Sequence, residues 1–194
     1  MTAPTPPTPP PAAPPAPGGV RVVRARVSDP VAAPLLRELG REYVSRYGSA
    51  ALREMTRYPD AEFAPPHGVL LLLVLDGAAV AGGAYRRYDE DTAELKRIWT
   101  HSAHRRRGLA RRVVAELERD AAARGYRRVR LTTGPRQPEA AGLYLAAGYT
   151  PLFDTAADPA GIDLLPFEKH LTPPTPRATA PATAGASPGG RGRR

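Results

Sequence analysis

The sequence predicts a mixed β-sheet covered by helices, an α/β fold of the α+β kind. Three observations carry this prediction. Strand-like and helix-like segments alternate along residues 19–171, one pair of apolar runs is joined by an Asp-Gly turn, and a long helix-like segment has one apolar face. Such a succession is typical of a sheet with helices packed against it. A chain of 194 residues with 42% hydrophobic residues has room for one well-buried core, so we expect one domain.

The domain begins with a strand and a helix. Residues 20–27 alternate apolar and basic side chains, as a half-buried strand does. Asp29 stands directly before Pro30, which suits a helix start, although Pro34 leaves the position of the first helical turn open. The helical pattern then continues to residue 48.

A hairpin and a third strand come next. Residues 70–75 are apolar without interruption, an Asp-Gly pair follows at 76–77, and a second apolar run covers residues 78–85. An Asp-Gly pair between two apolar runs indicates a tight β-turn. Residues 93–100 provide the next strand.

The remainder of the domain continues the alternation. Apolar residues recur at helical spacing over 109–121, and Gly125 marks the end of that helix. Residues 126–134 alternate like a strand, residues 138–149 suit a short helix ended by a glycine, and residues 163–171 complete the sheet.

Both ends of the chain differ from this domain. Residues 1–18 contain no charged residue and consist mostly of proline, alanine and threonine. Residues 172–194 repeat this composition and add four arginines without an acid. Such segments bury too little apolar surface to offset their chain entropy, so we expect two disordered tails around the domain of residues 19–171.

The formal net charge of +9 admits two interpretations. One is binding to nucleic acid or to an acidic membrane, and the other is a composition in which arginine replaces lysine on an ordinary solvated surface. The few aromatic residues are not interleaved with the basic ones, so we expect no nucleic-acid partner. No stretch approaches the roughly 20 apolar residues of a membrane span, and none resembles a signal peptide, so we expect a cytoplasmic protein without a membrane partner. The sequence has no cysteine and no histidine spacing typical of a metal site, so we expect no metal.

The segment from residue 104 to 126 places three arginines and a glycine directly ahead of a helix. The first turn of a helix has unpaired backbone N–H groups and carries the positive end of the macrodipole, so it attracts anions. Gly108 leaves the backbone open to close approach, and Arg105, Arg106 and Arg107 add charge. A di- or polyphosphate suits this arrangement. The alternative is an ordinary helix start with solvated arginines, but the position after a strand favours a phosphate site, although neither a Walker A nor a Rossmann glycine motif occurs.

Residues 93–151 resemble the GCN5-related N-acetyltransferases, the GNAT family. The acetyl-CoA signature of that family, [QR]-x-x-G-x-[GA], is matched by RRRGLA, with Arg105, Gly108 and Ala110 at the defined positions. The strand, phosphate cradle, helix, strand and final helix follow in the family's order. The resemblance extends over residues 19–171 and implies a mostly antiparallel sheet in which one parallel strand pair splays apart.

The resemblance also implies how acetyl-CoA binds. Backbone amides of the signature would hold the pyrophosphate, and the edge of the preceding strand would pair with the pantetheine arm as an added strand does. Gln137 stands near a position where many relatives carry an asparagine that contacts this arm. The implied cofactor-binding residues are Ile98, Trp99, Thr100, Arg105, Arg106, Arg107, Gly108, Leu109, Ala110 and Gln137.

Two residues take catalytic roles by resemblance. Glu94 occupies a position where several relatives keep a general base, although it could instead be a strand carboxylate paired with Lys96 or an arginine. Tyr144 matches the tyrosine that donates a proton to the departing thiolate, and a phenol is protonated at neutral pH. Packing in the core is the alternative for Tyr144.

The implied function is that of an acetyl-CoA-dependent N-acetyltransferase, an acyltransferase of the EC 2.3.1 type, which transfers its acetyl group by direct attack of a primary amine. That amine-bearing acceptor could be a small molecule or a protein. A non-catalytic acyl-CoA-binding sensor or interaction module of the same fold is the alternative, and a basic nucleic-acid-binding protein is a third. The sequence decides neither the acceptor nor the oligomeric state, and a homodimer stays open.

Overall fold

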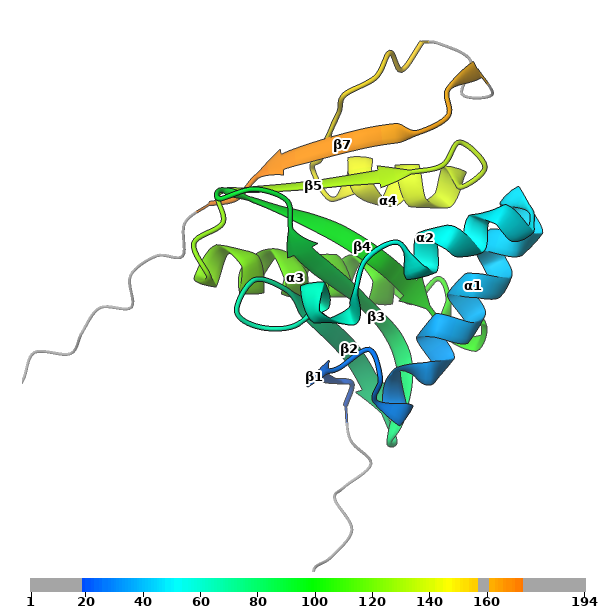
Figure 1. The fold of residues 1–194 in the computed structure, drawn as a ribbon, viewed down its shortest axis with the longest axis vertical. Helices are drawn as coiled ribbons and strands as arrows, with labels where there is room; N and C mark the ends of the chain where they lie inside the picture. The colour runs from blue at the N-terminus through cyan, green and yellow to red at the C-terminus, as the bar shows by residue number, and fades with distance from the viewer. Residues whose placement is uncertain (1–18, 157–160, 173–194) are drawn as a thin grey trace, which may run out of the picture.

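The computed structural model describes residues 19–156 and 161–172, so that both predicted tails, apart from Thr172, lie outside the described residues. Within them, seven strands form one mixed sheet flanked by helices, which confirms the predicted fold class (Figure 1). The strands are β1 (Arg21–Ala25), β2 (Val69–Leu75), β3 (Ala78–Arg87), β4 (Thr92–Thr100), β5 (Arg128–Thr133), β6 (Thr150–Pro151) and β7 (Leu165–His170). Their order across the sheet is β1-β2-β3-β4-β5-β7-β6.

Four α-helices and four short 3₁₀ turns connect the described strands. They are η1 (Pro30–Ala32), α1 (Ala33–Tyr47), η2 (Ser49–Ala51), α2 (Leu52–Thr56), η3 (Asp60–Phe63), η4 (Ser102–His104), α3 (Leu109–Ala123) and α4 (Pro138–Ala146). Pro34 lies in the first turn of α1, where its missing N–H costs no helical hydrogen bond. We did not predict α2 or β6 from the sequence, because five and two residues are too few to show a periodic pattern.

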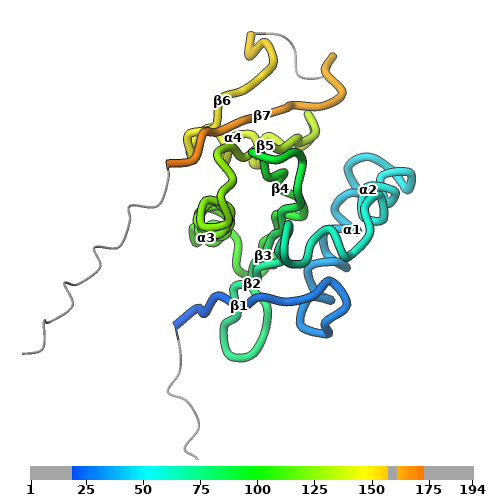
Figure 2. Tube along the Cα trace, turned by 60° about the vertical axis from the view of Figure 1, so that its left-hand side comes forward, coloured from blue at the N-terminus to red at the C-terminus, as the bar shows by residue number. Residues whose placement is uncertain are grey.

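Helices cover both faces of the sheet. Figure 2 shows α3 on one side of strands β1 to β4 and α1 with α2 on the other. Leu71 of β2 packs in the cluster beneath α3, whereas its neighbours Leu70 and Leu72 pack in the cluster beneath α1. Successive side chains of a strand point to opposite faces, so a strand covered on both faces must be apolar throughout. This explains the uninterrupted apolar run of β2.

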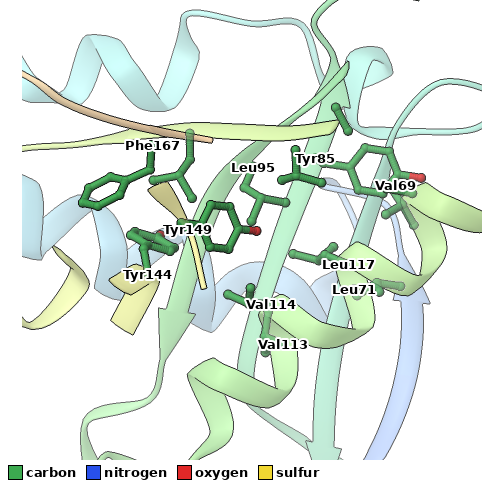
Figure 3. Packing of buried hydrophobic residues seen from close by; sticks show 14 of the residues in the cluster. Val69, Leu71, Tyr85, Leu95, Val113, Val114, Leu117, Tyr144, Tyr149 and Phe167 are labelled. Atoms are coloured by element: carbon green, nitrogen blue, oxygen red, sulfur yellow. The ribbon is translucent and has the colours of Figure 1, made fainter. Parts of the chain in front are cut away.

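A second feature of the core holds α3 in place. Asp120 of α3 is buried and accepts hydrogen bonds from the Tyr85 phenol at 2.6 Å and from Nε of Arg124 at 2.8 Å. Burial alone would raise the pKa of Asp120, but these hydrogen bonds and the positive charges of Arg124 and Arg24 outweigh it and lower the pKa. The carboxylate therefore links α3 to β3. Val113, Val114 and Leu117 of α3 pack in the same hydrophobic core as Tyr85 (Figure 3).

The sheet divides between β4 and β5. These strands run parallel and pair only from Thr92 to Glu94 against residues 128–130, while the other described strand pairs are antiparallel. Beyond Glu94, the edge of β4 that faces β5 has no strand partner among the described residues. The predicted splayed pair is thus present, and backbone groups of β4 lie open toward the gap.

A β-bulge in β4 accompanies this divergence. The register between β3 and β4 shifts, so that Arg97 and Ile98 together oppose Gly83, and Arg97 adopts a left-handed φ of 59°. A Cβ at Gly83 would lie 2.5 Å from Cδ1 of Ile98, so a larger residue there would require the side chains around the bulge to shift. A bulge bends its strand, and this one lies in the part of β4 that β5 does not accompany.

Candidate functional site

A pocket of about 620 Å³ lies where β4 and β5 diverge. Its walls come from α1, α2, the end of β4, the start of α3, the end of β5 and α4. The structure brings most of the predicted site residues together there, namely Ile98, Trp99, Thr100, Arg105, Arg106, Gly108, Leu109, Ala110, Gln137 and Tyr144. Arg107 and Glu94 are not among the lining residues.

One end of the pocket is formed by the first turn of α3. Gly108 caps this helix with a left-handed φ of 74°, and Arg106 has a φ of 62°. The amide of Arg112 donates to the Gly108 carbonyl at 3.1 Å, so the three preceding N–H groups have no partner within the helix. Such groups at the positive end of a helix form an anion-binding concavity.

The arginines beside this turn differ in their surroundings. Arg105 pairs with Glu42 of α1 at 3.0 Å, so its charge is already shared across the pocket. Arg106 is exposed and lines the pocket, whereas Arg107 is exposed outside it. The positive charge available to a ligand therefore comes mainly from the helix N–H groups and Arg106, and less from the arginines than the run of three suggests.

The middle of the pocket runs along the free edge of β4. The Oγ1 of Thr100 is enclosed there without a hydrogen-bond partner in the described residues. Trp99 lines the pocket and also packs in the core beneath α1, with its Nε1 donating to Glu38 at 3.2 Å. Gln137, at the start of α4, accepts a hydrogen bond from Oγ1 of Thr133 at 3.2 Å, which holds its amide near the end of β5.

Tyr144 of α4 is buried at the pocket wall. Its ring packs against Tyr149 and Phe167, with centroids 5.6 and 5.7 Å apart (Figure 3). Burial raises the pKa of the Tyr144 phenol above its ordinary value, and the nearby Tyr43 adds to the rise. The phenol is therefore protonated at neutral pH, which is the state that can donate a proton.

Glu94 lies away from the pocket lining. Its carboxylate is buried and pairs with Arg86 at 2.8 Å and with Lys96 at 3.5 Å. Lys96 does line the pocket, and its ammonium also pairs with Glu54 of α2 at 2.8 Å. Sequence reasoning missed Glu54, because nothing in its short helix signals that it folds over the pocket. Lys96 thus joins two carboxylates, of which Glu54 is the one that reaches the cavity.

The described residues bear on two possible partners, a membrane and a metal ion. None of their helices is long and apolar enough to cross a bilayer. Within the same ranges, histidine and acidic side chains form no group of three or more that could hold a metal ion.

Comparisons with known proteins agree with this geometry. Residues 33–149 match the acetyltransferase (GNAT) family. The chain therefore belongs to that family, whose co-substrate is acetyl-CoA. The resemblance recognised in the sequence is confirmed. No curated protein matches the chain.

Solved structures show the same fold. A GNAT-family acetyltransferase from Staphylococcus aureus aligns with a TM-score of 0.63 and 11% identity, covering 79% of this chain and 100% of that one. A Klebsiella pneumoniae protein described as an acyl-CoA N-acyltransferase aligns with a TM-score of 0.62 and 24% identity. The alignment covers 79% of this chain and 98% of that one. A GNAT acetyltransferase from Elizabethkingia anophelis with acetyl-CoA bound aligns with a TM-score of 0.53 and 15% identity. The alignment covers 78% of this chain and 98% of that one.

The cradle at α3 makes a direct prediction for Gly108. A Cβ at this position meets nothing within 4 Å, so Gly108→Val strains only the left-handed backbone, by about 1–2 kcal/mol. We expect acetyl-CoA binding to weaken roughly tenfold or more, because the added side chain stands beside the open N–H groups. Isothermal titration of the variant with acetyl-CoA measures this.

Gly125→Val is the matched control. Gly125 also has a left-handed φ, 93°, and open space around its Cβ, but it does not line the pocket. It should lose similar stability and keep its affinity for acetyl-CoA. Equal affinities of the two variants would remove the cradle from the site.

Proposed function

We propose that this protein is an acetyl-CoA-dependent N-acetyltransferase that transfers the acetyl group directly to a primary amine. The observation that carries the proposal is that one pocket joins the first turn of α3 to Tyr144 through the gap between β4 and β5. Family membership supports acetyl transfer, and the acetyl-CoA-bound relative supports acetyl-CoA binding by this fold. The amine acceptor and the roles of the individual residues are our inference.

Acetyl-CoA would lie along the length of the pocket. The N–H groups of Leu109, Ala110 and Arg111 would donate to its diphosphate, with Arg106 adding charge. The free edge of β4 at Ile98 and Thr100 would pair with the amides of the pantetheine arm, as an added strand does. The thioester then reaches the gap where the walls from α1, α2 and α4 meet.

The transfer step needs one proton donor and one proton acceptor. The amine nitrogen attacks the thioester carbonyl carbon, the new C–N bond forms, and the C–S bond breaks. Tyr144 gives its proton to the departing thiolate, and a carboxylate takes the proton that the amine nitrogen loses. The position of Tyr144 at the pocket wall supports its role as the donor, and a phenol is protonated at neutral pH.

Two carboxylates are candidates for the proton acceptor. Glu94 is the residue that the sequence suggested, but it is held in a buried pair with Arg86 and does not line the pocket. Glu54 lines the pocket and is held by Lys96. We propose that Glu54 takes the proton and that Glu94 positions Lys96 beside it.

The proposed function predicts both binding and turnover. A hundredfold excess of acetyl-CoA over its Kd should raise the Tm by about 5–10 °C, because the ligand stabilises only the folded chain. Thiol release measured against a panel of primary amines should then identify at least one acceptor. A Tm shift without release by any amine would favour the non-catalytic acyl-CoA sensor, and no Tm shift would contradict both functions.

The role of Tyr144 predicts a selective loss of turnover. Tyr144→Phe should lower kcat about 100-fold or more while leaving the Kd of acetyl-CoA nearly unchanged, because only the proton donor is removed. Tyr149→Phe is the control, since Tyr149 is equally buried but does not line the pocket. A Tyr144→Phe variant as active as the control would show that the phenol is dispensable.

The two carboxylates differ in the effect that we expect from substitution. Glu54→Gln should lower kcat/KM by about 10²–10⁴-fold, because the group that accepts the proton is removed. Glu94→Gln should lower kcat/KM less, because Glu94 acts only by positioning Lys96. The rate of thiol release separates the two variants, and a larger loss in Glu94→Gln would return the role of base to Glu94.

A further inference from the structure

The bulge in β4 holds an arginine whose charge is incompletely paired. Arg97 is only 7% exposed, and its guanidinium lies over the Phe63 ring at 4.1 Å. Its Nη2 donates to the Met55 carbonyl of α2 at 2.9 Å. Its Nη1 is enclosed and has no hydrogen-bond partner in the part of the chain that the structure describes. Buried polar groups are nearly always hydrogen-bonded, so this free donor requires a reason.

Nearby carboxylates do not supply the missing partner. Glu54 is taken by Lys96 at 2.8 Å and by Arg57 at 3.6 Å. Burial lowers the pKa of Arg97, while Asp60 opposes that effect from a distance without forming an ion pair with it in the described structure. A buried cation without a counter-ion is costly, so the site favours an anion from outside the chain.

The position of Arg97 indicates which molecule brings that anion. Arg97 lines the same pocket as Tyr144, and Tyr43 lies near both residues. The phosphates of acetyl-CoA are assigned to the first turn of α3, at the other end. The pantetheine arm and acetyl group that reach the gap carry no charge. An anion beside Arg97 must therefore belong to the acceptor.

We propose that Arg97 binds the carboxylate of the acceptor, which makes the acceptors compact amines that carry a carboxylate, such as free amino acids. This inference rests on the proposed function and specifies its substrate class. The pocket of about 620 Å³ must hold both the acyl arm and the acceptor, which favours a small molecule. Nη2 is bound to Met55 and Nη1 has no partner among the described residues, so the proposal assigns one carboxylate oxygen to Nη1.

The first experiment compares matched acceptors. Thiol release by the full-length protein is measured with α-, β- and γ-amino acids, with the amide of each, and with phosphoethanolamine. We expect kcat/KM for the best amino acid to exceed that of its amide by roughly 100-fold or more, because the amide leaves the buried cation unpaired. Equal rates for acid and amide would overturn the inference, and a preference for phosphoethanolamine would overturn the carboxylate assignment.

Arg97 variants test the residue itself. The left-handed φ of 59° suits glycine and asparagine, so Arg97→Gly and Arg97→Asn remove the charge without adding backbone strain. Both should lose the preference for acid over amide, whereas Arg97→Lys should keep part of it. An unchanged Tm shift with acetyl-CoA shows that each variant is folded. Should the variants fail to fold, the wild-type ratio of acid to amide still decides.

Arg106→Gly is the matched control. Arg106 is also an arginine of the pocket with a left-handed φ, 62°, but it lies at the phosphate end. It should weaken acetyl-CoA binding and keep the preference for a carboxylate. Loss of the preference in Arg106→Gly, or its persistence in Arg97→Gly, would contradict the assignment.

Failure of the inference differs from failure of the proposed function. One outcome is that the protein releases no thiol, while amino acids raise the Tm of its CoA complex and their amides do not. That outcome would retain the Arg97 site without transferase activity. If the protein acetylates amines equally well with and without a carboxylate, the transferase function stands and the assignment of Arg97 is wrong. Neither release nor a Tm change with any amino acid would overturn the inference.

Discussion

The site depends on one constraint, the end of hydrogen bonding between β4 and β5 at Glu94. Backbone N–H and C=O groups in a protein interior need partners, and the remaining edge of β4 has none from the strand beside it. The bulge at Arg97 lies in this unpaired part of β4, and Gly83 leaves room for it. A ligand that contains amides can complete the strand edge, which is why a gap in the sheet becomes a binding site rather than a defect.

Charge is distributed along the pocket in a way that matches this geometry. The first turn of α3 offers unpaired N–H groups and an exposed arginine at one end. The edge of β4 in the middle of the pocket is mostly neutral. Arg97 in the bulge, its neighbour Lys96 and Glu54 of α2 also line the pocket. An elongated ligand with phosphates at one end and an uncharged arm therefore fits in one direction. The charges near the bulge are left for a second substrate, and this separation connects the proposed transferase with the proposed acceptor class.

The environments of Tyr144 and Glu94 show how the fold changes what a side chain can do. Tyr144 and Glu94 were both assigned from their positions in a family pattern. Tyr144 lies at the pocket wall, where burial favours its protonated form. Glu94 does not line the pocket, and Arg86 and Lys96 hold its carboxylate. A family position therefore predicts where a residue lies in the fold, but the groups packed around its side chain decide what that side chain can do.

The sequence by itself predicted most of the elements and the helix start at which we propose the phosphate cradle. The cradle is made of consecutive residues, 105–110, at the start of a helix whose apolar spacing is plain, so its geometry follows from local backbone structure. Only the tertiary structure decided that Glu54 joins Lys96, that Glu42 takes the charge of Arg105, and that the Arg97 guanidinium is enclosed beside α2. Those contacts join residues more than 40 positions apart, and α2 has no periodicity that would announce its place. Local patterns follow from the backbone, whereas pairing between distant charges depends on which surfaces the folded chain brings together.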